Sequence, residues 1–569
     1  MVKTKGGSRE MPRDLGALKS DLMKRWSALE NERSTWMKTW RDISDYIAPH
    51  LGRFRSVTDK NKGDRNESYI IDDSARIAHR TFCSGMQSGL TSPARPWFKL
   101  MLPGDPEKSD YPEYRAWLDK CAEILLRIFA KSNAYSSFLD TYAECGSFGV
   151  HAFLVEKDFD TVIRCRPFTV GEYALSTDHV GRVNTFMRNF APNALQMVRA
   201  FGIDNVGVSV KRAYELGDMS SRFEVIHGIT PNTGRNVEKI DNRNMPFMSV
   251  YFDPADKSGK LLRFSGYKQF PAITPRWSTV SDDVYSKSAP GWFALGNTKM
   301  IQELQSDCLE AIQKVIDPPV QVPAEMNLRA SVSTVPGGIN YLPTTGENGI
   351  RSLYDIRPDI EAVERKIERV SVNIERAFFS DLFLMLTSMD RQGMTATEVA
   401  ERHEEKLLML GPVLEQLYSE MLDPLIDRTF QIAAEAGIIP PAPLDLQGEE
   451  IRPEYVSTLA QAQRMVGTVA IEQTLAFAGS LISAFPEVRH KVNAMAALQK
   501  YGAYIGVPSD ILRPDEEAMA LLHQEMEQIQ AQQQAEQMQG AVQGAKTLSE
   551  TQVGNNSALD AVLGGLGGV

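Results

Sequence analysis

The stretch "NTKMIQELQSDCLEAIQKVID" (297–317) has the apolar spacing of a long amphipathic helix. Pro318 and Pro319 follow it directly, and their fixed backbone geometry ends the helix there. About 20 residues that each rise ~1.5 Å make a rod of roughly 30 Å. The sequence therefore predicts a rod with one apolar stripe, formed by Ile301, Leu304, Cys308, Ala311 and Val315.

A second rod is expected after a compact insertion. Residues 318–358 are rich in Pro and Gly and contain short strand candidates, as in "PGGINYLPTTGENG" (336–349). The helix that follows repeats apolar residues in a 3-4 pattern over nearly three heptads. Two rods around a small insertion predict a helical hairpin that carries a tip. The predicted packing residues of the second rod are Ile360, Val363, Ile367, Val370 and Ile374.

The segment before the hairpin is expected to be an α+β region. Apolar residues recur at helical spacing over about 16–48, from Leu18 to Ile47, until Pro49 ends the helix. Residues 50–290 mix short helices with runs that have the composition of strands. These runs are "RFEVIHGI" (222–229), "PFMSVYF" (246–252) and "KLLRFSGYKQF" (260–270).

The segment after the hairpin is expected to be helical. Thr395 and Glu398 fit a capping box, and helix-compatible sequence runs to Ala436. Gly411-Pro412 must kink or break this helix. Helical sequence resumes to about residue 525, and the Gln/Ala-rich and Gly-rich remainder is expected to be disordered.

Composition excludes several classes of protein. The net charge of −11 speaks against a protein that wraps DNA with a basic face. The five cysteines are scattered and form no CxxC pair, so we expect buried free thiols. The N-terminus shows no secretory signal, and the longest apolar patch, "TLAFAGSLISAF" (474–485), is too short to span a bilayer. We expect a soluble protein made in the cytosol, without a membrane partner.

Three stretches contain residue types found in catalytic or ligand sites, and each has a simpler structural interpretation. His403 in "AERHEEK" (400–406) lacks the HExxH pattern of zinc proteases, which favours a solvated helix face. In "GWFALGNT" (291–298), Asn297 stands where a phosphate-binding loop needs lysine, and helix capping explains it. "SGMQSGLTSPARPWFKL" (84–100) has no GxSxG motif. We therefore expect no catalytic residue, no metal and no cofactor.

Nine stretches, in order along most of the chain, resemble one family: the portal, or head-to-tail connector, of short-tailed bacteriophages. They include "TWRDISDYIAPHLGRF" (39–54), "AECGSFGVHAFLVEKD" (143–158) and "VIDPPVQVP" (315–323). The other stretches are 84–100, 266–278, 285–305, 395–426, 454–465 and 506–521.

The resemblance implies a ring of about twelve subunits at one capsid vertex. Double-stranded DNA passes through its channel without sequence-specific contacts, during packaging and ejection. The implied partners are terminase, a tail adaptor protein, and capsid and scaffolding proteins. The implied location is the virion, after assembly in the host cytoplasm. The second hypothesis is another virion structural protein, such as a tail adaptor or internal core protein. The third is an enzyme of the terminase class.

The resemblance also divides the chain into parts of a portal-type fold that is α+β and mainly helical. The parts are a disordered N-terminus (1–15), an α+β wing (16–290), stem helix 1 (291–317), a clip (318–358), stem helix 2 (359–378), a tunnel loop (379–393), a kinked spine helix (394–436), a helical crown (437–525) and a low-complexity tail (526–569).

Two sets of residues are candidates for the channel wall. The tunnel-loop set is Met385, Thr387, Ser388, Met389, Asp390, Arg391 and Gln392. The alternative is that Leu382, Phe383, Leu384 and Leu386 extend the second rod into the wing core. The stem candidates are Arg365, Lys366, Arg369 and Arg376, on a helix that also carries five acidic residues. The apolar stripe of the same helix is expected to pack against the first rod and against neighbouring subunits.

Overall fold

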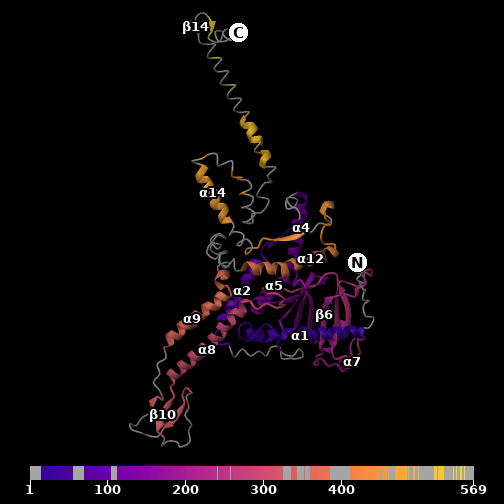
Figure 1. Ribbon diagram of the computed structural model, residues 1–569, viewed down its shortest axis with the longest axis vertical. Helices are drawn as coiled ribbons and strands as arrows, with labels where there is room; N and C mark the ends of the chain where they lie inside the picture. Colours follow the sequence, from indigo (N-terminus) through magenta and orange to yellow (C-terminus); the bar gives the residue numbers. More distant parts are fainter. Residues whose placement is uncertain are drawn as a thin grey trace, which may run out of the picture. The chain divides into compact units, whose positions relative to one another are not determined.

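The structure is a computed structural model of the chain, and Figure 1 shows its elements. The chain divides into two compact units, residues 1–466 and 467–569, and each is described by itself. The residues that the structure describes are 15–54, 70–103, 112–239, 241–256, 258–323, 333, 335–342, 351–352, 359–384, 410–446, 448, 451–457, 459, 468–482, and short pieces between 485 and 557.

The first helix, α1 (Leu15–Tyr46), confirms the prediction for the N-terminal segment. Its apolar residues recur at helical spacing, so they share one face, and that face is buried. The first half of the face packs against a β-sheet, through a cluster that includes Leu22 and Met187. In the second half, Trp40 is buried and its indole N–H donates to the carbonyl oxygen of Phe148 at 3.1 Å.

The sheet covered by α1 has five antiparallel strands in sequential order (Figure 1). Three of them, β6, β7 and β8, overlap the runs predicted to be strands, so that prediction is confirmed. Two short helices, α6 (Ala194–Phe201) and α7 (Val208–Glu215), lie between β5 and β6 in the chain. The strands are β4 (Tyr173–Thr177), β5 (Val183–Phe190), β6 (Val225–Pro231), β7 (Phe247–Phe252) and β8 (Arg263–Tyr267).

The main core lies between helices and a second, three-stranded sheet of order β3-β2-β9. Large aromatic side chains fill this core, among them Trp97 and Phe82, which are fully buried. A side chain at Gly146 would overlap the ring of Phe82, so this helix position must stay without one. The elements are α2 (Ser74–Leu90), α4 (Pro112–Lys131), α5 (Ala134–Phe148), β2 (Ala152–Asp158), β3 (Val162–Phe168) and β9 (Ala272–Ile273).

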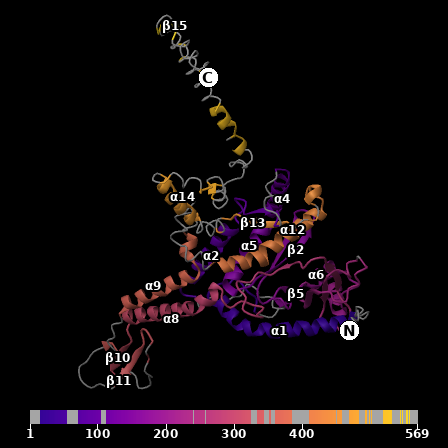
Figure 2. The same ribbon diagram turned by 45° about the horizontal axis from the view of Figure 1, so that its top comes forward.

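A long helical hairpin leaves this body and returns to it (Figures 1 and 2). Helix α8 (Pro290–Ile316) runs outward, α9 (Ile360–Ala377) runs back, and the two pack against each other. The tip between them carries a small sheet of order β11-β10-β12. We call these elements together the hairpin; its strands are β10 (Val320–Pro323), β11 (Ile339–Leu342) and β12 (Arg351–Ser352). The predicted pair of rods and the strand within 336–349 are confirmed.

Two local features fix the hairpin, one at its base and one at its tip. A side chain at Gly291 would overlap the carbonyl oxygen of Ser147, so α8 begins in direct contact with α5. At the other helix, the Asp359 side chain accepts a hydrogen bond from the Ala362 backbone N–H at 3.0 Å and caps α9. The close contact holds the hairpin against the body, and the cap sets where the returning helix starts.

After the hairpin, the described chain resumes as a helix at 410–417 and continues through a π-helical turn, η2 (Tyr418–Leu422), into α12 (Asp423–Glu435). The expected kink at Gly411-Pro412 lies at the edge of the described residues, and both residues are helical. The distortion occurs instead before Pro424. Proline has no N–H to donate and its ring crowds the carbonyl four residues earlier, so a wider turn accommodates it.

Residues 437–459 differ from the helical segment expected over 437–525. A short 3₁₀ helix, η3 (Leu444–Leu446), is followed by β13 (Arg452–Tyr455), which pairs antiparallel with β1 (Phe98–Met101). Prolines at 440, 441, 443 and 453 explain the correction, because they exclude a continuous helix. This part of the chain belongs to the first unit.

The second unit is described only in part. Its main element is α14 (Thr468–Ile482), and residues 523–530 are also helical. Two short strands, β14 (Gln552–Val553) and β15 (Asn556–Ser557), pair antiparallel within the expected tail. Most of the predicted tail at 526–569, like residues 1–14, lies outside the described residues.

Candidate functional site

A buried serine and histidine form a contact that resembles a nucleophile and its base. Ser147 Oγ on α5 lies 2.8 Å from His79 Nε2 on α2. The same Nε2 lies 3.0 Å from the carbonyl oxygen of Ala143, which can only accept, so Nε2 carries the hydrogen and donates it. It therefore has no lone pair for the serine proton. Burial also lowers the pKa of His79 to about 4, and the contact serves to join α2 to α5.

The other buried titratable groups near α5 are also structural. Glu144 Oε2 accepts hydrogen bonds from His151 Nδ1 at 3.1 Å and from the Val170 backbone N–H at 3.0 Å. Burial raises the pKa of the Cys83 thiol to about 12, so this thiol does not ionise near neutral pH. All five cysteines are free and buried, which confirms the prediction for them.

The described residues contain no metal-binding cluster and no membrane-spanning helix. Within them, no three His, Cys, Asp or Glu side chains are grouped so that they could hold a metal ion. None of the helices in that part of the chain combines the length and the apolar character needed to cross a bilayer.

The predicted packing stripe of α9 lies on one face of the helix, and its burial changes along the hairpin. Val370 and Ile374, near the body, are buried, with Ile374 fully inaccessible. Ile360, Val363 and Ile367, toward the tip, are half-buried. The face as a whole packs against α8, as predicted. Contacts with neighbouring subunits stay a prediction.

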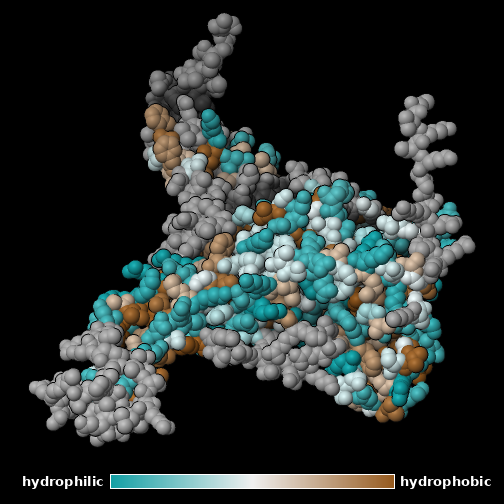
Figure 3. Space-filling view, turned by 60° about the horizontal axis from the view of Figure 1, so that its bottom comes forward, coloured by the Kyte–Doolittle hydropathy of each residue, from teal (hydrophilic) through white to brown (hydrophobic). Residues whose placement is uncertain are grey.

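The four basic residues predicted to line a channel are all exposed on α9. Arg365 pairs with Glu361 at 3.4 Å, on the same helix. Arg365, Arg369 and Arg376 are spaced by four and seven residues and therefore share one face, whereas Lys366 lies to one side of it. Figure 3 shows hydrophilic and apolar residues side by side on the surface of the hairpin.

An acidic stripe on α8 was missed when the sequence was considered alone. Glu303, Asp307 and Glu310 are spaced by four and three residues and are exposed on one face of the helix. The charged residues of α8 follow the same helical periodicity as its apolar stripe. The spacing within "ELQSDCLE" (303–310) carried the signal.

The predicted tunnel-loop residues Met385 to Gln392 lie outside the described residues, as does His403. The segment that leads to them is described. Residues 380–384 are helical, Leu382 and Phe383 are fully buried, and Phe383 fills the space beside Gly85. Leu384, in contrast, is 59% exposed. The start of the expected loop therefore belongs to the core, and we restrict the loop hypothesis to 385–393.

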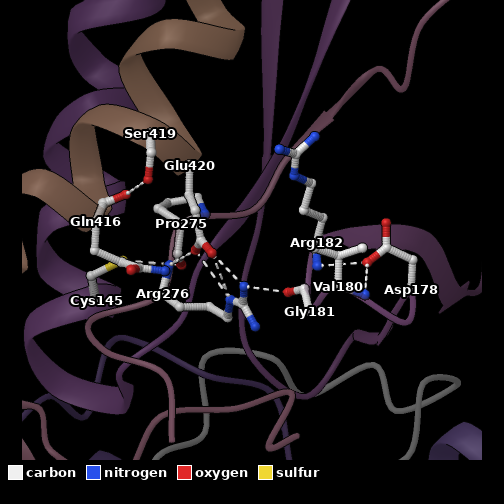
Figure 4. A network of polar contacts seen from close by, with 10 residues as sticks. All are labelled: Cys145, Asp178, Val180, Gly181, Arg182, Pro275, Arg276, Gln416, Ser419 and Glu420. Atoms are coloured by element: carbon white, nitrogen blue, oxygen red, sulfur yellow. Dashed lines mark hydrogen bonds and ion pairs between the residues drawn. The ribbon is translucent and has the colours of Figure 1, made fainter. Parts of the chain in front are cut away.

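A buried ion pair joins the π-helical turn to the body (Figure 4). Arg276, which is 4% exposed, donates from Nε to both carboxylate oxygens of Glu420 at 3.0 and 3.1 Å, and from Nη2 to Oε1. The backbone N–H of Arg276 donates to Glu420 Oε2 at 3.0 Å. Its Nη2 also donates to the carbonyl oxygen of Gly181, in the turn between β4 and β5, at 2.9 Å. One arginine therefore connects three segments that are distant in sequence.

Comparison with known proteins identifies the family. A family model described as "Bacteriophage head to tail connecting protein" matches residues 19–512. Because this match covers most of the chain, the chain belongs to that family.

Two relatives are similar over almost their whole length. The chain is 40% identical over 550 residues to "Portal protein" of Salmonella phage epsilon15, covering 96% of this chain and 98% of the relative. It is 40% identical over 539 residues to "Probable portal protein" of Bordetella phage BPP-1, covering 95% and 96%. Among solved structures, the match to "Neck of empty GTA particle computed with C6 symmetry" covers 77% of this chain and 95% of that chain. The sequence identity is 12% and the TM-score is 0.31.

Proposed function

We propose that this chain is a portal protein: a ring at one capsid vertex, through which DNA is packaged and ejected. The observation that carries the proposal is the 40% identity to two phage proteins named as portals, over almost their full length. The function is structural rather than enzymatic, and the protein is a component of the virion.

The elements fit the parts of a portal subunit. The α+β body before α8 is the proposed wing, α8 and α9 are the stem, and the tip at 318–358 is the clip. The helical segment from 410, with its π-helical turn, is the spine. The crown is proposed to begin after residue 466, because 437–459 belong to the first unit.

The partners follow from this role. The ring holds about twelve copies, so charges of −11 amount to roughly −132. A mainly acidic channel repels the phosphate backbone, so DNA slides without adhering. The clip is the proposed docking site for terminase and then for the tail adaptor, and the wing contacts capsid and scaffolding proteins. The ring assembles in the host cytoplasm.

The proposed channel wall includes the loop 385–393 and Lys366 of α9. In the loop, Arg391 would make exchangeable contacts with DNA phosphates, while Met385 and Met389 would fill a narrowing without fixing one shape. Arg365, Arg369 and Arg376 of α9 are also candidates for this wall, with a neighbouring subunit as their alternative partner.

The first test is the assembly state. Native mass spectrometry and negative-stain electron microscopy of the purified chain are expected to show rings of about twelve subunits. A tail adaptor would instead assemble only on a preformed portal. A chain that stays monomeric under all assembly conditions and joins a separate portal ring would favour that alternative and contradict the proposal.

A deletion tests the loop. Removing 385–391 is expected to leave rings intact and to impair DNA packaging or retention, because the segment would contact DNA rather than the subunit core. Ring formation is measured by electron microscopy and packaged DNA by nuclease protection. If the deletion abolishes rings, the segment belongs to the core and the loop assignment is wrong.

A further inference from the structure

The outer face of α8 carries two acidic residues, Glu303 and Asp307, whose charge is not neutralised within the described part of the chain. The lysines of this face are already paired: Lys299 with Asp42 at 2.7 Å and Lys314 with Glu310 at 2.6 Å. Glu303 and Asp307 lie between these two lysines in the sequence. Neither has a hydrogen bond or ion pair within the described part of the chain. We call Glu303, Asp307 and Glu310 the acidic stripe.

The face of α9 turned away from its buried residues carries the opposite charge. Arg365, Arg369 and Arg376 lie on it, and we call them the arginine stripe. Arg369 and Arg376 have no partner among the residues that the structure describes. Val372 lies between Arg369 and Arg376 in the sequence, on the same face of the helix, and is 38% exposed.

The two stripes lie at corresponding heights on the hairpin. Asp307 lies nine residues before the end of α8 at Ile316, and Arg369 lies nine residues after the start of α9 at Ile360. The helices run antiparallel, so both residues are about 13 Å from the tip ends of their helices. They would pair if they shared one side of the hairpin. Since neither has a partner among the described residues, which include both helices, the stripes face different sides.

We infer that the acidic stripe of one subunit binds the arginine stripe of the next subunit around the ring. This inference rests on the proposed portal function. A cyclic ring repeats one head-to-tail contact, in which one side of a subunit meets a different side of its neighbour. Rotation about the ring axis preserves height, so it brings Asp307 of one copy to the level of Arg369 of the next. Complementary charges then select the correct neighbour and its register.

The rival occupant of the arginine stripe is DNA in the channel. Phosphate contacts would account for the arginines, but not for unneutralised acidic residues at the same height on the adjacent helix. A second copy of the chain accounts for both stripes, so the inference commits to it.

Charge reversal tests the pairing in the full chain. Glu303→Lys/Asp307→Lys makes both stripes basic, and Arg369→Glu/Arg376→Glu makes both acidic. Each variant is expected to give at least about tenfold less ring than wild type, because like charges then face each other at every contact. Combining all four substitutions in one chain is expected to restore rings. Mixing the two double variants in equal amounts is also expected to restore rings, in which basic and acidic subunits alternate.

Asp119→Lys/Glu123→Lys is the matched control. It reverses two exposed acidic residues with the same spacing on α4, and is expected to form rings as wild type does. All substituted positions are exposed, so we expect every variant to fold. Circular dichroism of each variant verifies this.

The outcomes separate the inference from the proposed function. A wild-type chain that forms no ring contradicts the function itself. Wild-type rings together with full ring yield from both charge variants would overturn the pairing and leave the function intact. Full ring yield with lost DNA retention in the Arg369→Glu/Arg376→Glu variant would also overturn it, and would assign the stripe to the channel. Failure of the mixture and of the combined variant would overturn it as well.

Discussion

Replacing Arg276 by Met is expected to destabilise the folded chain by about 3–5 kcal/mol, because it leaves the Glu420 carboxylate without its partner in a mostly buried position. The loss is large because the guanidinium also holds the carbonyl oxygen of Gly181, and the Arg276 backbone N–H alone cannot compensate the charge. The measurement is the urea midpoint and melting temperature at one fixed protein concentration, since assembly also contributes to stability.

Two further variants control this result. Arg127→Met removes the exposed pair with Glu123, and is expected to cost less than about 1 kcal/mol. The double variant Arg276→Met/Glu420→Met is expected to lose less stability than the sum of the two single variants, because no uncompensated charge remains. Additive losses, or an Arg276→Met variant as stable as Arg127→Met, would show that the pair does not join the π-helical turn to the body.

Introducing a charge at Ile374 is expected to cost at least about 3 kcal/mol and to detach α9 from the body. Ile374 is 0% exposed and belongs to the main core, so an aspartate there has no water and no described cationic partner. We expect Ile374→Asp to lower the melting temperature and to prevent ring assembly, as measured by differential scanning fluorimetry and electron microscopy.

The neighbouring position gives the matched control. Asn373→Asp adds the same charge on the exposed face of α9, and is expected to change stability by less than about 0.5 kcal/mol. Ile367→Asp, at a half-buried position, is expected to reduce stability less than Ile374→Asp and still to prevent ring assembly. Wild-type stability of Ile374→Asp would mean that this face of α9 does not pack as described.

Elements set by local periodicity could be predicted from the sequence. The stripe from Leu18 to Ile47 identified α1, and the 3-4 pattern from Ile360 identified α9, because such patterns depend on one helix alone. The pairing of Phe98 with Tyr455 could not be predicted, because strand partners more than three hundred residues apart leave no local signal. The helical segment expected over 437–525 was wrong at its start for this reason, and because Pro440, Pro441 and Pro443 exclude a continuous helix there.

The charged and polar contacts were harder to predict than the elements. Arg276 and Glu420 are ordinary residues in the sequence, and only the folded chain brings them together. The π-helical turn depends on how Pro424 is accommodated, which the sequence leaves open. The arginines of α9 could be predicted as candidates from their spacing, but their acidic counterpart on α8 could not, because the match in height depends on how the two helices pack.

The hairpin has a consequence for how such proteins diversify. The tip joins the rest of the chain at two points only, after Ile316 on α8 and before Ile360 on α9, and these helices lie side by side. A change in length or content between those points leaves the body sheet and the contact of α8 with α5 untouched. We therefore expect that exchanging the whole segment 318–358 leaves the described body folded. Under the proposed function, in which the tip is the docking site, a lineage that acquires a new tip would meet new partners while its descendants keep the inherited body.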